Sequence, residues 1–128
     1  AVCAYANEPL LVKVSGNGTV APDWKERATC EVYVDKVVVT YQSGSTSSVV
    51  TVGNTLSKNV VKLIDDASKE TPDVAPGPVG GPTTTWSGYT EEYGIRTKVT
   101  LKASGGYNAT NKSNAARILV GLLDLVCK

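Results

Sequence analysis

The sequence predicts an α+β fold: an antiparallel β-sheet with an N-terminal hairpin and a C-terminal amphipathic helix packed on one face, with an additional middle helix as an option. Three observations predict it. Segments rich in Val, Thr and Tyr are separated by glycine-containing turns, residues 95–103 alternate between apolar and polar, and residues 115–126 carry apolar side chains at helical spacing. The chain has 128 residues, the size of one domain with one core, so we expect a single domain over residues 1–128.

The N-terminal segment predicts the opening hairpin. Leu10–Val14 alternates as a strand does, and Ser15–Gly18 contains two glycines that allow a tight turn. We expect Thr19–Ala21 to return from this turn before Pro22 interrupts the strand.

Further strands are predicted in the next segment, which is rich in Val, Tyr and Thr. Thr29–Val34 and Lys36–Tyr41 are either two strands or one long strand bent near Asp35. Ser43–Ser48 is a polar turn, and Val49–Val52 is a short strand beyond it.

The periodicity changes over Asn54–Glu70, where apolar residues recur at helical spacing and charged residues lie largely opposite. This pattern predicts a helix that Asn54 can cap. Because several of the apolar residues are β-branched, a strand over Asn59–Ile64 is the alternative. Thr71–Thr85 is predicted to be a long exposed loop, since it contains four prolines and three glycines.

The last strand and helix carry the clearest patterns. Thr83–Tyr93 and Ile95–Ala103 flank Gly94, which we interpret as a bulge or bend. In the second segment alternate residues are expected to face the core, and the intervening ones the solvent. The core set is Ile95, Thr97, Val99, Leu101 and Ala103, and the opposite set is Arg96, Lys98, Thr100 and Lys102.

The C-terminal helix has one broad apolar stripe that must be buried. Asn108, Thr110 or Asn111 is expected to cap it. The stripe consists of Ala115, Ile118, Leu119, Leu122, Leu123 and Val126.

The net charge of +1 limits how the chain can bind a polyanion. A polyanionic partner must be met by a local patch or by many copies together.

The cysteines and the sequons bear on the compartment of the protein. The three cysteines, Cys3, Cys30 and Cys127, favour reduced thiols in a cytosolic product, with a Cys3–Cys127 disulfide as the alternative. The sequons at Asn17, Asn108 and Asn111 are attributed mainly to chance.

Catalytic chemistry is not indicated. The sequence has no histidine, no C-x-x-C spacing and no phosphate-binding glycine motif. The acid pairs Asp65-Asp66 and Glu91-Glu92 are interpreted as solvated surface, because adjacent acids point in different directions. No apolar run reaches the roughly 18 residues of a membrane span. We therefore expect no enzyme activity, metal, cofactor, membrane partner or small-molecule substrate.

The cationic row Arg96, Lys98 and Lys102 has two interpretations. The residues alone favour the solvated face of an antiparallel sheet. The functional alternative is a basic platform for nucleic-acid phosphates, where Tyr41 or Tyr89 could stack on unpaired bases.

The order of elements resembles the coat proteins of single-stranded RNA bacteriophages. Leu11–Pro22, "LVKVSGNGTVAP", is similar to their opening hairpin, and Lys36–Val52 to a pair of central strands. The Pro/Gly segment Asp73–Pro82 stands where their loop at the symmetry axes lies. "TTTWSGYTEEYGIRTKVTLKAS" resembles the final strand, and "NATNKSNAARILVGLLDLV" the helix. The helix expected at Asn54–Glu70 departs from that family's sheet.

The resemblance implies a homodimer that assembles into an icosahedral shell around single-stranded RNA, with localisation in a virion formed in the host cytoplasm. It implies RNA contacts from Arg96, Lys98, Thr100 and Lys102, with Lys36, Tyr41 and Gln42 as further candidates. It places dimer or assembly contacts on Ile118, Leu119, Leu122, Leu123 and Val126 of the helix, and on Pro76 and Pro78 of the loop.

Two other functions are compatible with the sequence. One is a small secreted α/β killer-toxin-like or effector domain with a Cys3–Cys127 disulfide and a glycan at Asn108 or Asn111. The other is a secreted inhibitor whose Pro/Gly loop enters the cleft of a partner.

Overall fold

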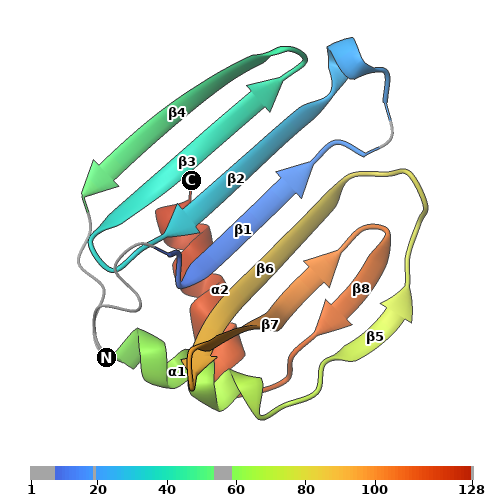
Figure 1. Cartoon of the computed structure of the whole chain (residues 1–128). Helices are drawn as coiled ribbons and strands as arrows, with labels where there is room; N and C mark the ends of the chain where they lie inside the picture. The colour runs from blue at the N-terminus through green and yellow to red at the C-terminus, as the bar shows by residue number, and fades with distance from the viewer. Residues whose placement is uncertain (1–7, 19, 54–58, 128) are drawn as a thin grey trace.

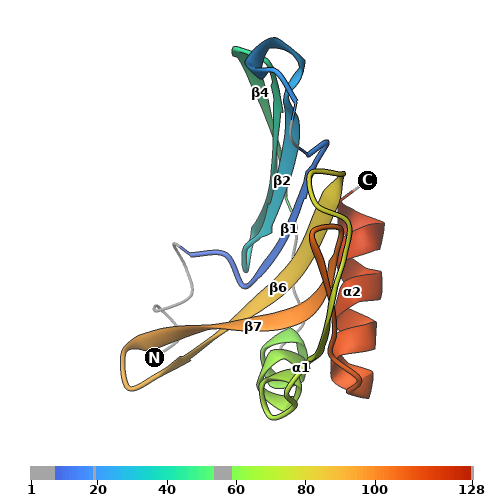
Figure 2. The same ribbon diagram turned by 90° about the vertical axis from the view of Figure 1, so that its right-hand side faces the viewer.

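A computed structural model of the chain describes residues 8–18, 20–53 and 59–127. Within them, eight antiparallel strands form one sheet in the order β4-β3-β2-β1-β6-β7-β8-β5, with α1 and α2 on one side (Figures 1 and 2). The predicted α+β class is confirmed. The strands are β1 Leu11–Gly16, β2 Glu26–Val32, β3 Lys36–Ser43, β4 Thr46–Gly53, β5 Asp73–Pro76, β6 Thr83–Glu92, β7 Ile95–Ser104 and β8 Tyr107–Thr110, and the helices are α1 Asn59–Ser68 and α2 Asn114–Val126.

The N-terminal hairpin exists, but its return strand was predicted too early. β1 pairs with β2, which begins at Glu26, whereas Val20 and Ala21 of the predicted return lie outside the strands and Thr19 lies outside the described residues. The side chain of Asn17 explains the wider turn: it donates to the Trp24 carbonyl and accepts from the Glu26 amide at 2.8 and 3.0 Å. A short 3-10 turn, Pro22–Trp24, fills the loop between them.

The central segment forms two hairpins. β2 and β3 are separate antiparallel strands, so the alternative of one strand bent at Asp35 was wrong. The turn between β3 and β4 is shorter than predicted, because only Gly44 and Ser45 separate the two strands. Gly44 has a φ of 58°, a conformation that glycine adopts without steric cost.

The middle segment is helical, as its periodicity predicted, and the alternative of a strand over 59–64 was wrong. The expected cap, Asn54, lies outside the described residues. Val60, Ile64 and Ala67 are buried against the sheet. The helix comes so close that a Cβ at Gly88 of β6 would lie 3.1 Å from a methyl carbon of Ile64.

The expected loop at 71–85 is partly a strand. Asp73–Pro76 forms β5, an edge strand that pairs with β8. Its sequence did not indicate a strand because Pro76 lacks a backbone donor, but an edge strand tolerates proline. Residues 77–82 lie outside the strands, in agreement with the predicted loop.

Gly94 is the turn of a hairpin, and the prediction of a bulge or bend within one strand was wrong. β6 and β7 pair antiparallel on either side of Tyr93 and Gly94. Their φ values are 55° and 77°, which is the double left-handed conformation of a type I′ turn. Because the hairpin extends beyond the helices, Ile95 and Thr97 are exposed, whereas Val99 and Leu101 are buried in the core as predicted. Ala103 is also buried, but it lies outside the core cluster, opposite Thr85.

Helix α2 is capped by Ser113, so the prediction that Asn108, Thr110 or Asn111 is the cap was wrong. The Ser113 hydroxyl accepts from the Ala116 amide, and the Asn111 carboxamide oxygen accepts from the Ser113 amide and hydroxyl. Asn111 therefore supports the cap from two residues upstream. Leu119 and Leu123 of α2 are completely buried in the core between the helices and the sheet.

Candidate functional site

Neither of the two described helices covers one face of the sheet, which we call the open face. Residues of β1 show the alternation: Lys13 contacts α2 through Asp124, whereas its neighbours Val12 and Val14 point away from the helices. Neither helix lies over this face in Figure 2. Its residues include Val12, Val14, Arg27, Thr29, Glu31, Lys36, Val38, Thr40, Gln42, Ser87, Tyr89, Arg96, Lys98 and Thr100.

The predicted cationic row does not lie on one face. The register of β6 and β7 shifts between Trp86, opposite Lys102, and Ser87, opposite Thr100. This bulge leaves Leu101 without a partner residue in β6 and reverses the alternation of the residues that follow. Lys102 therefore lies on the helix side, with its ammonium 5.0 Å from the centre of the Trp86 ring. Arg96, Lys98 and Thr100 remain on the open face.

Arg96 and Lys98 differ in the contacts that their side chains make within the chain. The Arg96 guanidinium lies 3.8 Å from the centre of the Tyr89 ring and pairs with the Glu8 carboxylate at 3.0 Å. It also donates a hydrogen bond to the Pro9 carbonyl. Lys98 is exposed and has no ion pair among the described residues. Of the two cations of the row on the open face, Lys98 is thus the one without a counter-ion among the described residues.

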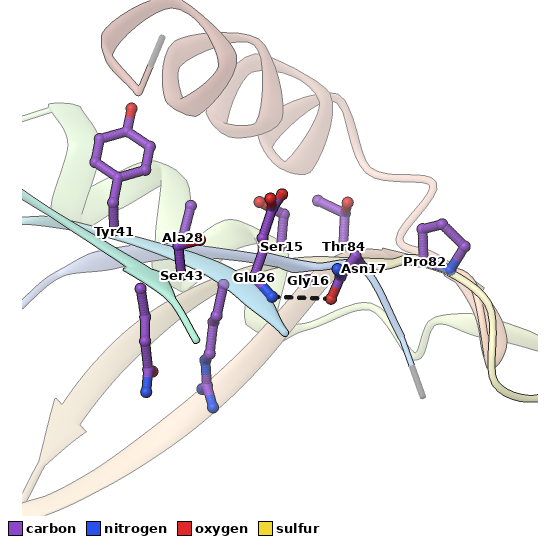
Figure 3. Close-up of a pocket in the computed structure, with 11 residues that line it drawn as sticks. Ser15, Gly16, Asn17, Glu26, Ala28, Tyr41, Ser43, Pro82 and Thr84 are labelled. Atoms are coloured by element: carbon purple, nitrogen blue, oxygen red, sulfur yellow. Dashed lines mark hydrogen bonds between the residues drawn. The ribbon is translucent and has the colours of Figure 1, made fainter. Parts of the chain in front are cut away.

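The candidates on β3 are also divided between the two faces. Lys36 lies on the open face, 4.9 Å from the centre of the Tyr33 ring, and Gln42 lies on the same side. Tyr41 lies on the opposite side, where it points toward α2 (Figure 3). The prediction that Tyr41 joins the cationic platform was wrong, because odd-numbered residues of β3 face the helices.

Tyr41 borders a shallow pocket at the end of the sheet, shown in Figure 3. Ser15, Glu26 and Thr84 line it on the same side. Glu26 is the single carboxylate among the residues that line it. Among the described residues, no cluster of three or more potential metal ligands exists.

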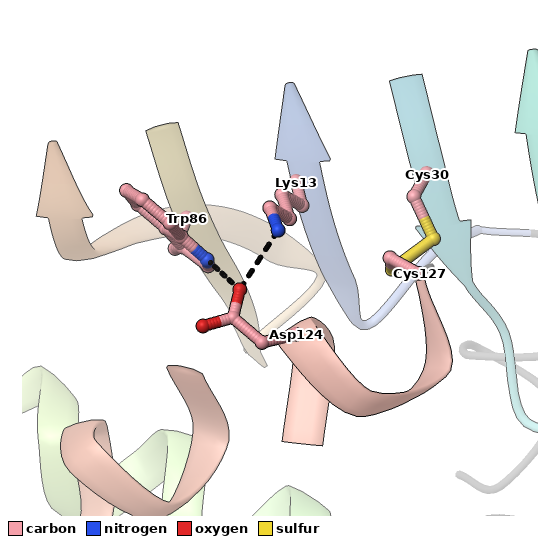
Figure 4. A network of polar contacts seen from close by, with 5 residues as sticks. All are labelled: Lys13, Cys30, Trp86, Asp124 and Cys127. Carbon is pink, nitrogen blue, oxygen red and sulfur yellow. Dashed lines mark hydrogen bonds and ion pairs between the residues drawn. A yellow bond between two sulfur atoms is a disulfide. The ribbon is translucent and has the colours of Figure 1, made fainter. Parts of the chain in front are cut away.

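A polar network fastens α2 to the sheet (Figure 4). One carboxylate oxygen of Asp124 accepts from the Lys13 ammonium and from the Trp86 indole, each at 2.8 Å. The ammonium groups of Lys13 and Lys102 lie 5.4 and 5.0 Å from the centre of the Trp86 ring. Partial burial alone would raise the pKa of Asp124, but the hydrogen bonds from Lys13 and Trp86 and the charges of Lys13 and Lys102 lower it overall.

This lowered pKa predicts a loss of stability in acid. The contribution of Asp124 is fully present above the pKa of an unfolded Asp, about 4, and is lost as the pH falls through its lower folded value. Urea unfolding of wild type and Asp124→Asn should therefore differ most near neutral pH and converge in acid. A difference that is independent of pH would contradict this role of the carboxylate.

The cysteine prediction requires correction. Cys30 of β2 and Cys127, just after α2, form a disulfide (Figure 4). The expectation of reduced thiols was wrong for these two residues, and so was the alternative Cys3–Cys127 pairing. Cys3 itself lies outside the described residues. Residues 97 positions apart in sequence meet because α2 crosses the sheet toward β2, a proximity that cysteine spacing alone does not indicate.

The sequons differ in their accessibility. Asn111 is only 2% exposed, and its amide donates to the Ala67 carbonyl at 2.9 Å. It is therefore a structural residue, and the expected glycan at Asn111 does not fit the folded chain. Asn108 in β8 is exposed.

The predicted assembly residues on α2 also separate into two groups. Leu119 and Leu123 belong to the core of this chain and have no surface left for a second subunit. Leu122 and Val126 are partly buried, and Ile118 is 56% exposed. In the preceding segment, Pro76 ends β5 and Pro78 is an exposed loop residue.

No protein-family model matches this chain, and no curated protein matches it. None of the described helices is long and apolar enough to cross a membrane.

Proposed function

We propose that this chain is a structural subunit of the coat-protein type, which self-assembles into an icosahedral shell and binds single-stranded RNA on its open face. The observation that carries the proposal is the uncovered sheet face, which combines hydroxyl groups, cations and an aromatic ring on one surface. Alternate residues of neighbouring strands point to this face, so their side chains lie beside one another on one surface.

The chemistry of the open face suits a single-stranded polyanion. Lys98 can approach phosphates, and the hydroxyls of Thr40 and Thr100 can donate to phosphate or sugar oxygens. The guanidinium of Arg96, which lies against the Tyr89 ring, is a planar group on which an unpaired base can stack. Because the net charge is only +1, we expect strong RNA binding only when many copies act together.

The bulge in β7 supplies a matched pair of variants that tests this proposal. Lys98→Gln should weaken binding of a single-stranded RNA oligonucleotide several-fold and reduce the slope of log K against log salt concentration by roughly 0.7. Lys102→Gln removes the same charge from the helix side, so RNA affinity should be unchanged. Fluorescence anisotropy at several salt concentrations measures the RNA affinity and the salt slope of both variants. The ratio of nucleic-acid to protein absorbance of purified particles is a second readout.

The outcomes separate clearly. Equal losses in both variants would mean that RNA senses only the net charge of the protein, and the open face would not be its binding surface. Wild-type protein that is free of RNA, binds no oligonucleotide and forms no particles in negative-stain images would overturn the proposal.

A second candidate is favoured by the Cys30–Cys127 disulfide: a small secreted effector-like domain that acts as a monomer. Disulfides are typical of oxidising compartments, and the exposed Asn108 could carry a glycan there. Size-exclusion chromatography with light scattering discriminates between the two. A monomer without nucleic acid supports the secreted domain, and large RNA-containing particles support the coat subunit.

A further inference from the structure

A small pocket lies on the helix side of the sheet, where β7 and β8 meet the first turn of α2. Leu101 and Val120 contribute to its apolar part, and Lys102, Thr110 and Arg117 supply its exposed polar side chains. Its volume is about 220 Å³, which is below the roughly 300–1,000 Å³ of pockets that hold drug-sized molecules. A ligand of this pocket must therefore be small.

The register of the sheet brings Lys102 and Thr110 to the same side. The two residues lie opposite each other in the antiparallel pair of β7 and β8, so their side chains point to the same face. The bulge in β7 turns Lys102 toward the helices, and Thr110 lies on that side with it. Arg117 reaches the same pocket from α2. Three elements thus direct two cations and a hydroxyl group into one pocket.

The two cations of this pocket lack an acidic partner. Neither Lys102 nor Arg117 forms an ion pair among the described residues. The ammonium of Lys102 lies 5.0 Å from the centre of the Trp86 ring, a contact that leaves N–H groups able to donate to a ligand. Two like charges that line one small pocket repel each other, and a bound anion would offset this repulsion.

The acids beside the pocket already have counter-ions. Asp73 of β5, the strand next to β8, pairs with Lys112 at 2.6 Å. Asp124, whose charge interacts with that of Lys102, pairs with Lys13 at 2.8 Å. Each of these acids is matched by a cation of its own, so the positive charge of the pocket remains uncompensated within the described part of the chain.

Asn111 holds the base of the pocket in place. Its side-chain amide donates to the carbonyls of Ala67 and Thr100 at 2.9 and 3.4 Å, and its oxygen accepts from the amide and hydroxyl of Ser113. These bonds join the end of β8 to β7, to α1 and to the start of α2. Asn111 thus has no polar group left for a ligand, but it fixes the elements that carry the cations before any ligand binds.

We propose that this pocket binds the phosphate group of inorganic phosphate or of a small phosphate monoester, held by Lys102, Arg117 and the Thr110 hydroxyl. The planar guanidinium of Arg117 can donate two parallel hydrogen bonds to phosphate oxygens, and the Lys102 ammonium acts as a point charge. The hydroxyl of Thr110 can donate to a third oxygen.

A phosphate monoester fits this pocket better than the RNA backbone does. Near pH 7 a monoester carries a charge of about −1.5 to −2, which matches two cations, whereas each nucleotide along a strand contributes one charge. The pocket also lies on the opposite side of the sheet from the open face. The phosphate site therefore goes beyond the proposed RNA surface, and either can exist without the other.

Isothermal titration calorimetry in phosphate-free buffer at low salt tests the site, with inorganic phosphate and glycerol phosphate as probes. Wild type should bind with a dissociation constant of about 1 mM or below. Lys102→Gln and Arg117→Gln should each weaken binding roughly tenfold, because each removes a charge-assisted hydrogen bond. Lys25→Gln is the matched control and should leave the affinity unchanged, since Lys25 is exposed before β2, and β1, β6 and β7 lie between β2 and β8.

The probes also distinguish the source of the phosphate group. Tighter binding of glycerol phosphate would assign the pocket to an organic monoester, and equal affinities would assign it to free phosphate. Dimethyl phosphate, which carries a single charge, should bind roughly tenfold more weakly than either. Lowering the pH from about 7 to about 5 should weaken the binding of glycerol phosphate, because protonation at its second pKa, near 6, removes one of its charges.

Three outcomes would overturn the proposal. They are a wild type that binds neither probe at about 10 mM, an equal loss of affinity in Lys25→Gln, and displacement of glycerol phosphate by an RNA oligonucleotide without terminal phosphates. Circular dichroism checks that the variants fold. Arg117→Gln keeps the test decisive if Lys102→Gln unfolds on losing its contact with Trp86, because Arg117 is exposed and has no ion pair among the described residues.

Discussion

Replacing Cys30 and Cys127 together by alanine is expected to lower the free energy of unfolding by about 3–5 kcal/mol. The disulfide joins residues 97 positions apart, and a loop of that length restricts the unfolded chain strongly, which the chain-entropy model places at about 4.7 kcal/mol for 100 residues. Urea unfolding at neutral pH measures the difference. Each single alanine variant should cost nearly as much as the double one, because either removes the same bond.

Thiol titration in denaturant provides the control for this prediction. Protein purified without reductant should contain one free thiol, and three after reduction, because the sequence has three cysteines and two form the disulfide. Three free thiols before reduction would contradict the disulfide and return the chain to the reduced state that its cysteine spacing suggested.

Substituting Leu119 by alanine is expected to destabilise the chain by about 2–5 kcal/mol, whereas Ile118→Ala should cost less than about 1 kcal/mol. The two residues are adjacent in α2, but Leu119 is 0% exposed and Ile118 56% exposed. The larger loss comes from the cavity that a truncated buried leucine leaves. Thermal and urea unfolding measure both variants at a protein concentration where their oligomeric state is the same.

Equal losses in the two variants would mean that both faces of α2 are covered. The coat-protein resemblance would predict that outcome if the whole stripe contacted a second subunit. The separation between Leu119 and Ile118 therefore also tests whether α2 packs mainly on its own sheet.

Local patterns were sufficient where one element determines the outcome. The alternation of Val99 and Leu101 and the helical spacing of Val60, Ile64 and Ala67 both predicted residues that are buried in the core. These patterns are reliable because a strand or an amphipathic helix must bury its apolar side, whatever lies against it.

Local patterns failed where a partner strand was needed to interpret them. Residues 73–76 form β5 because β8 lies beside them, and nothing in the proline-rich sequence indicates that neighbour. The prediction of a bend at Gly94 was wrong, since the sequence does not show whether the flanking strands continue or fold back. Ser113 could not be distinguished as the cap of α2, because several neighbouring residues can also cap a helix.

The candidate RNA surface shows what the sequence predicts and what it does not. The sequence by itself determined the α+β class, the amphipathic helices and the cationic character of the last long strand, because each depends on the order of side chains along one element. The tertiary structure decided which cations share a surface: the bulge opposite Trp86 and Ser87 turns Lys102 toward α2 and leaves Lys98 on the open face. It also decided which cysteines meet. These properties depend on register and on the path of α2 across the sheet, and they arise only when segments far apart in the chain come into contact.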